Sequence, residues 1–303
     1  MTRGKSLPGH SLAELLDRAS SRLSAAGIDQ ARADAELLAI YCFKKQEGRQ
    51  LSRGRLQALA LAGLLELSPD FVAYYEQLLD QRASRVPLQH ITGVAYFRSL
   101  ELKVGPGVFV PRPETELLVS YALDYVDRAL AAGAEQQLRV IDLCTGSAAI
   151  ALSLKTERPH LEVYAVEVSE LAHAWARENL AASGVHLILG DARQVSPEQE
   201  ATFDLVTCNP PYIPTAARPS EPEVRDHDPH LALYGGSPDG LAIPAAMVDA
   251  AYRLLKPGGM LILEHAHTQR QALSSIIQGQ GFVQLKTRDD LLGRARHISA
   301  LKA

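Results

Sequence analysis

From residue 138 onward, short apolar segments alternate with amphipathic segments of helical period. The apolar segments are rich in β-branched residues, which is typical of buried strands. Strands that alternate with helices form a mostly parallel sheet with helices on both faces, and such a sheet binds ligands at the carboxyl ends of its strands. We therefore expect a Rossmann-like α/β domain. The expected strands are Arg139–Leu143, Val163–Val168, Val185–Leu189, Phe203–Cys208, Met260–His265 and two near Phe282–Lys286 and His297–Leu301.

The same part of the chain predicts the helices that cover the sheet. One helix follows the first strand and continues through Leu154, and Ser169 caps the next one. Pro238–Leu255 predicts a third helix, and a fourth ends at Gln280. Residues 210–236 show no periodic pattern, so we expect a long irregular segment after the fourth strand.

The beginning of the chain shows helical periodicity alone. Apolar residues recur at helical spacing after Ser11, a candidate N-cap, and Gly27 closes this run. Mixed charges such as Arg32 and Glu36 are typical of a solvated helix face. We expect a small helical domain for binding or orientation of a partner. Its further helical segments are Asp34–Phe43, Leu56–Leu67 and Pro69–Arg85.

A proline-containing linker joins these two parts. Tyr96–Lys103 and Gly107–Val110 alternate apolar and polar residues on either side of Val104–Gly107, which predicts a β-hairpin. Two prolines within Pro111–Glu116 restrict the backbone, and a helix over Leu117–Leu130 follows. We expect a rigid linker that carries part of the function. The three expected parts are residues 1–86, 87–116 and 117–303.

Composition and cysteine usage exclude several classes of protein. The net charge is −4, whereas binding to nucleic acid through its phosphates needs an excess of Lys and Arg. Cys42, Cys144 and Cys208 are widely spaced, so we expect no disulfide framework and no metal site. The first ten residues lack the apolar core of a secretory signal, and no window contains the ~18 apolar residues of a membrane helix. We expect a cytoplasmic protein without membrane partners.

Two features at strand ends indicate a nucleoside ligand. The first strand leads into the small-residue turn Cys144–Ala148, and the second ends at Glu167. In a dinucleotide-binding fold, such a turn approaches the pyrophosphate and the acid binds the ribose hydroxyls, but this turn lacks the full G-x-G-x-x-G pattern. A ligand with a nucleoside and no phosphates suits the pair, and S-adenosylmethionine is such a ligand.

The strongest chemical signal is the run Asn209-Pro210-Pro211-Tyr212 after the fourth strand. The prolines remove two backbone donors, so the Pro210 carbonyl can face a cleft, and the Asn209 side-chain oxygen is a second acceptor. Two acceptors at a fixed separation suit the two hydrogens of a planar NH₂ group. Holding them aims the nitrogen lone pair at a methyl donor and stabilises the positive charge that develops on nitrogen. Tyr212 can pack on the planar group or face a sulfonium.

These motifs resemble those of a known family. Residues 139–212 resemble the class I S-adenosylmethionine-dependent methyltransferases that methylate amino groups. Nearly the whole chain resembles the PrmC/HemK family of peptide chain release factor N5-glutamine methyltransferases. The resemblance implies a seven-stranded, mostly parallel sheet behind an N-terminal substrate-recognition domain. The further segments that carry it are Pro87–Gly93, Phe97, Val110–Glu116, the loop from Asp228 to Leu241, Leu263–His265 and Gln269.

The resemblance implies a reaction and a set of site residues. The implied reaction transfers a methyl group from S-adenosyl-L-methionine to the side-chain nitrogen of the glutamine in the Gly-Gly-Gln motif of class 1 release factors, and it leaves S-adenosyl-L-homocysteine. The catalytic residues would be Asn209, Pro210 and Tyr212, and Pro211, Phe97 and Arg112 would complete the substrate site. The cofactor would contact Asp142, Cys144, Thr145, Gly146, Ser147, Ala148, Glu167, Asp191, Ala192 and Asn209.

Three positions differ from the common pattern of the family. Cys144 and Ala148 stand where many members have glycine, and Ala192 follows Asp191 where an aromatic residue commonly covers the adenine. Asp191 can still accept a hydrogen bond from the adenine amino group, but without stacking we expect weaker cofactor binding than in typical members.

Other functions share the same motif. The main alternative is the glutamine methyltransferase of a ribosomal large-subunit protein, in whose branch the context of Cys144 also occurs. A second, less favoured alternative is an N6-adenine DNA methyltransferase, which would need a basic surface and base flipping. A non-catalytic adaptor would be expected to lose the Asn209–Tyr212 run, which is intact. An amide becomes acidic only after alkylation, so we expect no catalytic histidine and assign His265 and His267 structural or rim positions.

Overall fold

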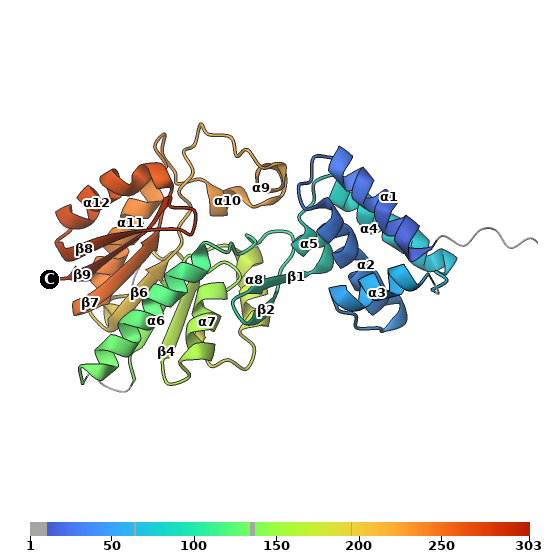
Figure 1. Ribbon diagram of the computed structural model, residues 1–303. Coiled ribbons are helices and arrows are strands. Elements are labelled where there is room, and N and C mark those ends of the chain that lie inside the picture. Colours follow the sequence, from blue (N-terminus) through green and yellow to red (C-terminus); the bar gives the residue numbers. More distant parts are fainter. Residues whose placement is uncertain (1–10, 64, 134–136, 195) are drawn as a thin grey trace, which may run out of the picture. The chain divides into compact units, whose positions relative to one another are not determined.

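The computed structural model describes residues 11–63, 65–133, 137–194 and 196–303 (Figure 1). Its contacts divide the chain into two compact units. Of the described residues, the smaller unit comprises those from Ser11 to Gly93 together with Glu221–His227, and the larger comprises those of Val94–Ser220 and Asp228–Ala303. The expected limits at residues 86 and 116 remain predictions, and the first ten residues lie outside the described part. Within the described residues, no helix has the length and apolar character needed to cross a membrane.

The smaller unit is helical, as predicted. Ser11 and Glu14 form a reciprocal capping box, with two hydrogen bonds of 3.2 Å between backbone N–H groups and side-chain oxygens. Phe43, Phe71 and Tyr75 are fully buried at the centre of this unit. The helices are α1 (Leu12–Ala25), α2 (Ala31–Glu47), α3 (Arg53–Ala62), α4 (Pro69–Ala83), α5 (Leu88–Thr92) and α9 (Pro222–His227).

Helix α9 belongs to this unit although it is distant in the sequence from the other five helices. Arg82 donates from Nε to Asp34 Oδ2 over 2.7 Å and from Nη1 to Glu223 Oε1 over 2.8 Å. Arg85 Nη2 lies 2.6 Å from the other Glu223 oxygen. Arg82 is almost fully buried, and its charge-assisted hydrogen bonds, together with that of Arg85, anchor residues 221–227.

The predicted hairpin is present, but its turn was placed wrongly. The strands β1 (Val94–Phe97) and β2 (Leu100–Lys103) pair in antiparallel register, so the turn lies at Arg98 and Ser99. Arg98 has φ 51°, and its backbone N–H donates to Glu116 Oε1 over 2.8 Å. The turn contains neither glycine nor asparagine, so sequence alone carried no signal for it. Residues 104–110 instead pack apolar side chains beside α8 (Glu170–Asn179).

The larger unit contains the predicted seven-stranded sheet, with strand order β5-β4-β3-β6-β7-β9-β8. Strands β3 to β7 run parallel, and β9 is antiparallel to both of its neighbours. The prediction of a Rossmann-like, mostly parallel sheet is therefore confirmed. The strands are β3 (Arg139–Leu143), β4 (Glu162–Glu167), β5 (His186–Leu189), β6 (Phe203–Cys208), β7 (Leu255–Glu264), β8 (Phe282–Asp289) and β9 (Ala295–Lys302).

Helices cover both faces of this sheet (Figure 1). Successive side chains of a strand point to opposite faces, so Val140 and Ile141 of β3 enter different cores. Val140 packs with residues of α6 and α7, and Ile141 packs with residues of α11 and α12. These helices are α6 (Thr115–Ala131), α7 (Ala149–Glu157), α11 (Ala242–Leu254) and α12 (Arg270–Gly279).

Several other boundaries differ from the sequence prediction. Strand β7 begins at Leu255 instead of Met260 and ends at Glu264, so residues 257–259 lie within the strand. The segment after β6 is not wholly irregular, because it contains α9 and α10 (His230–Leu233). Helix α11 begins at Ala242 instead of Pro238, since the Ser237 hydroxyl and the Asp239 carboxylate accept hydrogen bonds from the backbone N–H of Leu241. This local turn competes with the helix for the same donor.

Candidate functional site

The loop after β3 runs close to the neighbouring strand β4. The Thr145 N–H donates to the Val166 carbonyl over 3.0 Å. Cys144, Gly146 and Ala148 have φ values of 58°, 57° and 65°, so three residues of five adopt left-handed backbone. This conformation costs a non-glycine residue about 1–2 kcal/mol. A Cβ at Gly146 would meet nothing within 4 Å, so the loop backbone offers space into which a ligand can approach closely.

Glu167, at the end of β4, reaches back to this loop. Its Oε2 accepts the Gly146 N–H over 2.8 Å, and its Oε1 accepts the Ser169 N–H over 2.8 Å. The residue is 7% exposed, and burial raises the pKa of its carboxyl, against the effect of the backbone hydrogen bonds. Each carboxylate oxygen has a further lone pair, so the group can also accept from two ribose hydroxyls.

Asp142 lies beneath the loop and is fully buried. Thr145 Oγ1 donates to its Oδ2 over 2.6 Å, and Thr207 Oγ1 donates to its Oδ1 over 2.8 Å. Desolvation by burial raises the pKa of Asp142 to about 7. Asn179 Nδ2 donates to the Ser147 carbonyl over 3.0 Å, which fixes the other end of the loop. Asp142 therefore supports the loop from below.

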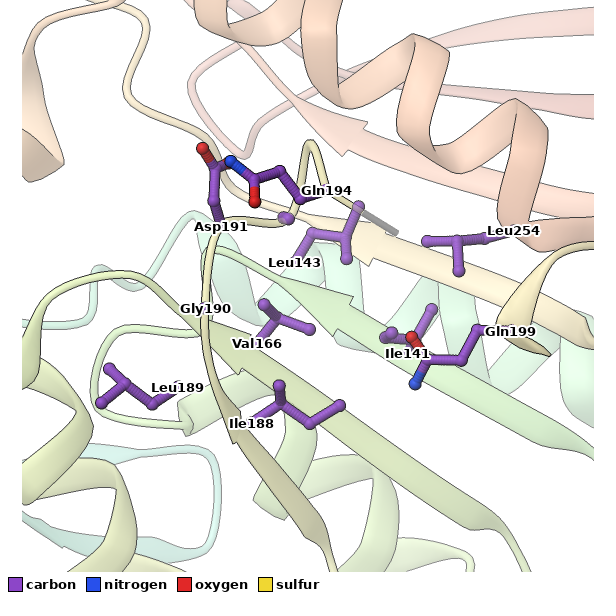
Figure 2. A pocket seen from close by; sticks show the side chains of 11 residues that line it. Ile141, Leu143, Val166, Ile188, Leu189, Gly190, Asp191, Gln194, Gln199 and Leu254 are labelled. Atoms are coloured by element: carbon purple, nitrogen blue, oxygen red, sulfur yellow. The ribbon is translucent and has the colours of Figure 1, made fainter. Parts of the chain in front are cut away.

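Asp191 follows β5 and lines a cavity of about 230 Å³. Its carboxylate accepts hydrogen bonds from the backbone and guanidinium of Arg193, which lower its pKa. Ala192 is half-buried and also lines the cavity. Figure 2 shows Ile141, Val166 and Ile188 projecting into the cavity from neighbouring strands, with Asp191 and Gln194 at one end.

The Asn209–Tyr212 run begins beside the loop after β3. Leu143 and Cys208, the last residues of β3 and β6, are register partners, so Cys144 and Asn209 leave neighbouring strands at the same edge. Pro210 is buried and Pro211 is half-buried. Side chains predicted for the cofactor and for the substrate therefore meet at the carboxyl edge of the sheet, where a doubly wound fold binds its ligands.

Asn209 is connected to two buried residues from other parts of the chain. Its Nδ2 donates to Thr115 Oγ1 over 3.2 Å, and Thr115 Oγ1 donates to Glu264 Oε2 over 2.8 Å. Thr115 is 4% exposed and Glu264 is 2% exposed. Thr115 opens α6, and Glu264 is the last residue of β7, so two separate elements position one side chain of the run.

Tyr212 is held at its ring and at its backbone. Its hydroxyl lies 3.4 Å from Glu264 Oε1, and burial together with this carboxylate raises the pKa of Tyr212. Buried Gln269 donates from Nε2 to the Tyr212 and Asp239 carbonyls, each over 2.9 Å. Gly240 has φ 74°, and a Cβ there would overlap the Tyr212 carbonyl oxygen. Only glycine therefore fits at residue 240. The contacts with Gln269 and Gly240 hold the Tyr212 end of the run in place.

The two remaining predicted substrate residues lie in different surroundings. Phe97 is 1% exposed and packs in the core with residues of α6 and α7. Arg112 is half-buried, donates to Asp228 Oδ2 over 2.8 Å, and has its guanidinium 4.9 Å from the centre of the Phe109 ring. A direct role of either side chain on a substrate remains a prediction.

The histidines near β7 occupy different positions. His265 is fully buried, its Nδ1 lies 2.7 Å from the Ala266 carbonyl oxygen, and burial lowers its pKa. His267 is exposed at the start of the next turn. The ring of His265 is therefore held by packing and by one hydrogen bond at Nδ1.

Sequence reasoning assigned no role to several residues of this network. Thr115, Glu264 and Gln269 entered only as parts of segments that resemble a family. Thr207 and Asn179 carried no signal, because one strand threonine or helix asparagine looks like any other. Glu264 at the end of an apolar strand could have been noticed, since a carboxyl group that a strand carries into the interior requires hydrogen-bond partners.

Two family models match the chain over most of its length. A "PrmC N-terminal domain" model matches residues 14–93, and a "Methyltransferase small domain" model matches residues 118–220. The first match covers the helices α1 to α5, apart from the first two residues of α1. The second covers the strands β3 to β6 and the Asn209–Tyr212 run.

Curated relatives cover nearly the whole chain. The release factor glutamine methyltransferase of Bifidobacterium longum is 42% identical over 96% of this chain and 99% of the relative. The protein of the same name from Streptomyces coelicolor is 45% identical over 94% of this chain and 96% of the relative. A 4-amino-L-phenylalanine/4-methylamino-L-phenylalanine methyltransferase of Streptomyces pristinaespiralis is 40% identical over 89% of this chain and 88% of the relative.

Proposed function

The chain belongs to the release factor glutamine methyltransferases, and we propose that it methylates the side-chain nitrogen of the glutamine in the Gly-Gly-Gln motif of class 1 release factors. The observation that carries this proposal is the Asn209–Tyr212 run, which begins beside the small-residue loop after β3. A modification of that glutamine would modulate translation termination in the cytoplasm.

The cofactor we propose is S-adenosyl-L-methionine, whose sulfonium supplies an electrophilic methyl group when it is bound. The open space above Gly146 allows the backbone to approach the ligand. Glu167 would accept from the ribose hydroxyls, because its carboxylate already points at this loop. Asp191 would bind the adenine amino group only after one of its contacts with Arg193 is exchanged. Buried Asp142 would act through Thr145, which it holds in the loop.

The acceptor site would work by positioning an amide nitrogen. Asn209 Oδ1 and the Pro210 carbonyl would accept the two amide hydrogens of the substrate glutamine. This arrangement aims the nitrogen lone pair at the methyl group and stabilises the charge that develops on nitrogen. The Tyr212 ring would pack against the planar amide. Its hydroxyl stays protonated because burial and Glu264 raise its pKa, so Tyr212 supplies a surface and no base.

The proton leaves after the methyl group has been transferred. The N-methylated amide carries a positive charge and is a strong acid, so water can take its proton without a catalytic base. Burial lowers the pKa of His265 and favours its neutral form. The proposed chemistry therefore assigns no step to this histidine.

The decisive experiment measures transfer of a labelled methyl group from S-adenosylmethionine to a purified class 1 release factor. We expect label on the wild-type factor and none on a factor whose Gly-Gly-Gln glutamine is replaced by alanine. Ribosomal large-subunit protein, DNA and 4-amino-L-phenylalanine serve as alternative acceptors, the last because one relative is named for it. Label on one of these acceptors, with none on the release factor, would assign the chain to that substrate.

A further inference from the structure

The number of hydrogens that each group can donate determines which groups donate and which accept around Asn209. A threonine hydroxyl has one hydrogen to donate, and Thr115 Oγ1 donates it to Glu264 Oε2. Thr115 Oγ1 lies 2.8 Å from Glu264 Oε2, so its hydrogen is committed to Glu264. The same oxygen can then only accept from Asn209, which lies 3.2 Å away. The group that faces Thr115 must therefore be the NH₂ end of the Asn209 amide.

This constraint decides which end of the amide remains for a ligand. The nitrogen and oxygen of an asparagine amide are similar in size, and hydrogen bonds alone select one orientation. If the amide were reversed, its oxygen would face the Thr115 oxygen without a hydrogen between them. Its NH₂ group would then face the substrate position, where it cannot accept a hydrogen from another NH₂ group.

We propose that Thr115 and Glu264 are positioning residues that hold the Asn209 amide with its oxygen toward the substrate nitrogen. This inference rests on the proposed function, in which Asn209 Oδ1 accepts a hydrogen of the glutamine amide. Glu264 fixes the hydroxyl of Thr115, and Thr115 fixes Asn209. Neither positioning residue needs to touch the substrate, and both are almost fully buried.

Glu264 also reaches the other end of the same run. Its second oxygen lies 3.4 Å from the Tyr212 hydroxyl, so one carboxylate holds Asn209 through Thr115 and Tyr212 directly. This arrangement fixes the Asn209 oxygen and the Tyr212 ring relative to each other. A buried carboxylate with donors at both oxygens is also well satisfied, which explains how it is tolerated in the interior.

The test compares Thr115→Val, which removes the hydroxyl and keeps the shape, with Thr115→Ser, which keeps the hydroxyl. Methyl transfer to the release factor is measured at saturating cofactor. We expect Thr115→Val to lower kcat by about 10- to 100-fold, because the acceptor oxygen is no longer held in place. We expect Thr115→Ser to stay within about 3-fold of wild type. The KM for S-adenosylmethionine should stay within about 2-fold in both variants, because Thr115 lies at the acceptor side.

Ser120→Ala is the matched control. It also removes a hydroxyl from α6, but that hydroxyl accepts a hydrogen bond from Arg98 and does not contact Asn209 or Glu264. A purely structural effect of Thr115 would lower thermal stability and raise both KM values. If Thr115→Val does not fold, Thr115→Ala removes the same hydroxyl and takes its place. The inference is overturned if the variant without the hydroxyl keeps wild-type kcat, or if Thr115→Ser loses as much as it does. Wild-type enzyme that fails on the release factor would instead overturn the proposed function.

Discussion

The loops after β3 and β6 leave neighbouring strands at one edge of the sheet, yet they are stabilised differently. The Cys144–Ala148 loop is held mainly by nearby groups of its own sheet, among them Glu167 and the Val166 carbonyl. It stores strain in left-handed non-glycine residues. The Asn209–Tyr212 run is held by side chains from α6, the end of β7 and the turn that follows it. The first loop would approach a ligand with its backbone, and this requires left-handed residues. The second presents side-chain and carbonyl acceptors, which are held by residues far away in the sequence.

The largest expected effect comes from removing the acceptor itself. Asn209→Ala should lower kcat for methyl transfer by about 100- to 1000-fold, because the loss of one preorganised polar contact to the reacting group costs this much. The dissociation constant for S-adenosylmethionine, measured by calorimetry, should change by less than about 3-fold.

The contrasting variant is Glu167→Gln, on the cofactor side. It should raise the dissociation constant for S-adenosylmethionine by about 10-fold, since a hydrogen bond to a charged group contributes about 1.5–3 kcal/mol.

Near-normal turnover by Asn209→Ala would show that the acceptor pair is not required.

The second prediction removes a distant anchor of the acceptor run. Gln269→Leu removes three hydrogen bonds: two that Nε2 donates to the Tyr212 and Asp239 carbonyls, and one that Oε1 accepts from the Ala266 N–H. Each such bond contributes about 0.5–1.5 kcal/mol. We expect the free energy of unfolding to fall by about 2–4 kcal/mol in urea denaturation. Gln271→Leu on the exposed face of α12 is the control and should change stability by less than about 0.5 kcal/mol. Equal effects of the two variants would argue against the anchor.

The third prediction concerns pH and the support beneath the cofactor loop. Burial raises the pKa of Asp142 to about 7, above its value of about 3.9 in an unfolded chain. Between these values the folded state binds a proton that the unfolded state has lost, so stability falls as pH rises. From pH 5 to pH 7, Asp142 should lower the free energy of unfolding by about 2 kcal/mol.

Asp142→Asn has no proton to lose at this position and should not show this part of the pH dependence. Urea denaturation of both proteins at pH 5, 6 and 7 measures the difference between their slopes. Parallel stability curves for wild type and variant would mean that Asp142 is ionised in the folded protein throughout this range.

The smallest expected effect isolates the strain of the cofactor loop. Cys144→Gly and Cys144→Ala both remove the sulfur, but only glycine adopts φ 58° without strain. We expect the glycine variant to be more stable than the alanine variant by about 0.5–1 kcal/mol, after the greater freedom of glycine in the unfolded chain is counted. Thermal unfolding of the two variants provides the comparison. A more stable alanine variant would show that this backbone conformation is not strained.

Local patterns predicted much of this architecture. Periodicity and β-branched runs located the strands β3 to β6 and the helices of the smaller unit, because both depend on residues close in sequence. The hairpin turn at Arg98 was missed, since its conformation depends on contacts with Glu116 and Glu157. The start of α11 was missed because Ser237 and Asp239 take the donor of Leu241.

The sequence by itself determined the kind of chemistry at the carboxyl edge of the sheet. The Asn209–Tyr212 run and the small-residue turn with Glu167 are contiguous or lie at strand ends, so their residue types can be read directly. Only the tertiary structure decided how Asn209 is oriented. Thr115 and Glu264 are far from Asn209 along the chain, and hydrogen bonds are directional contacts that form only when folding brings the donors and acceptors together.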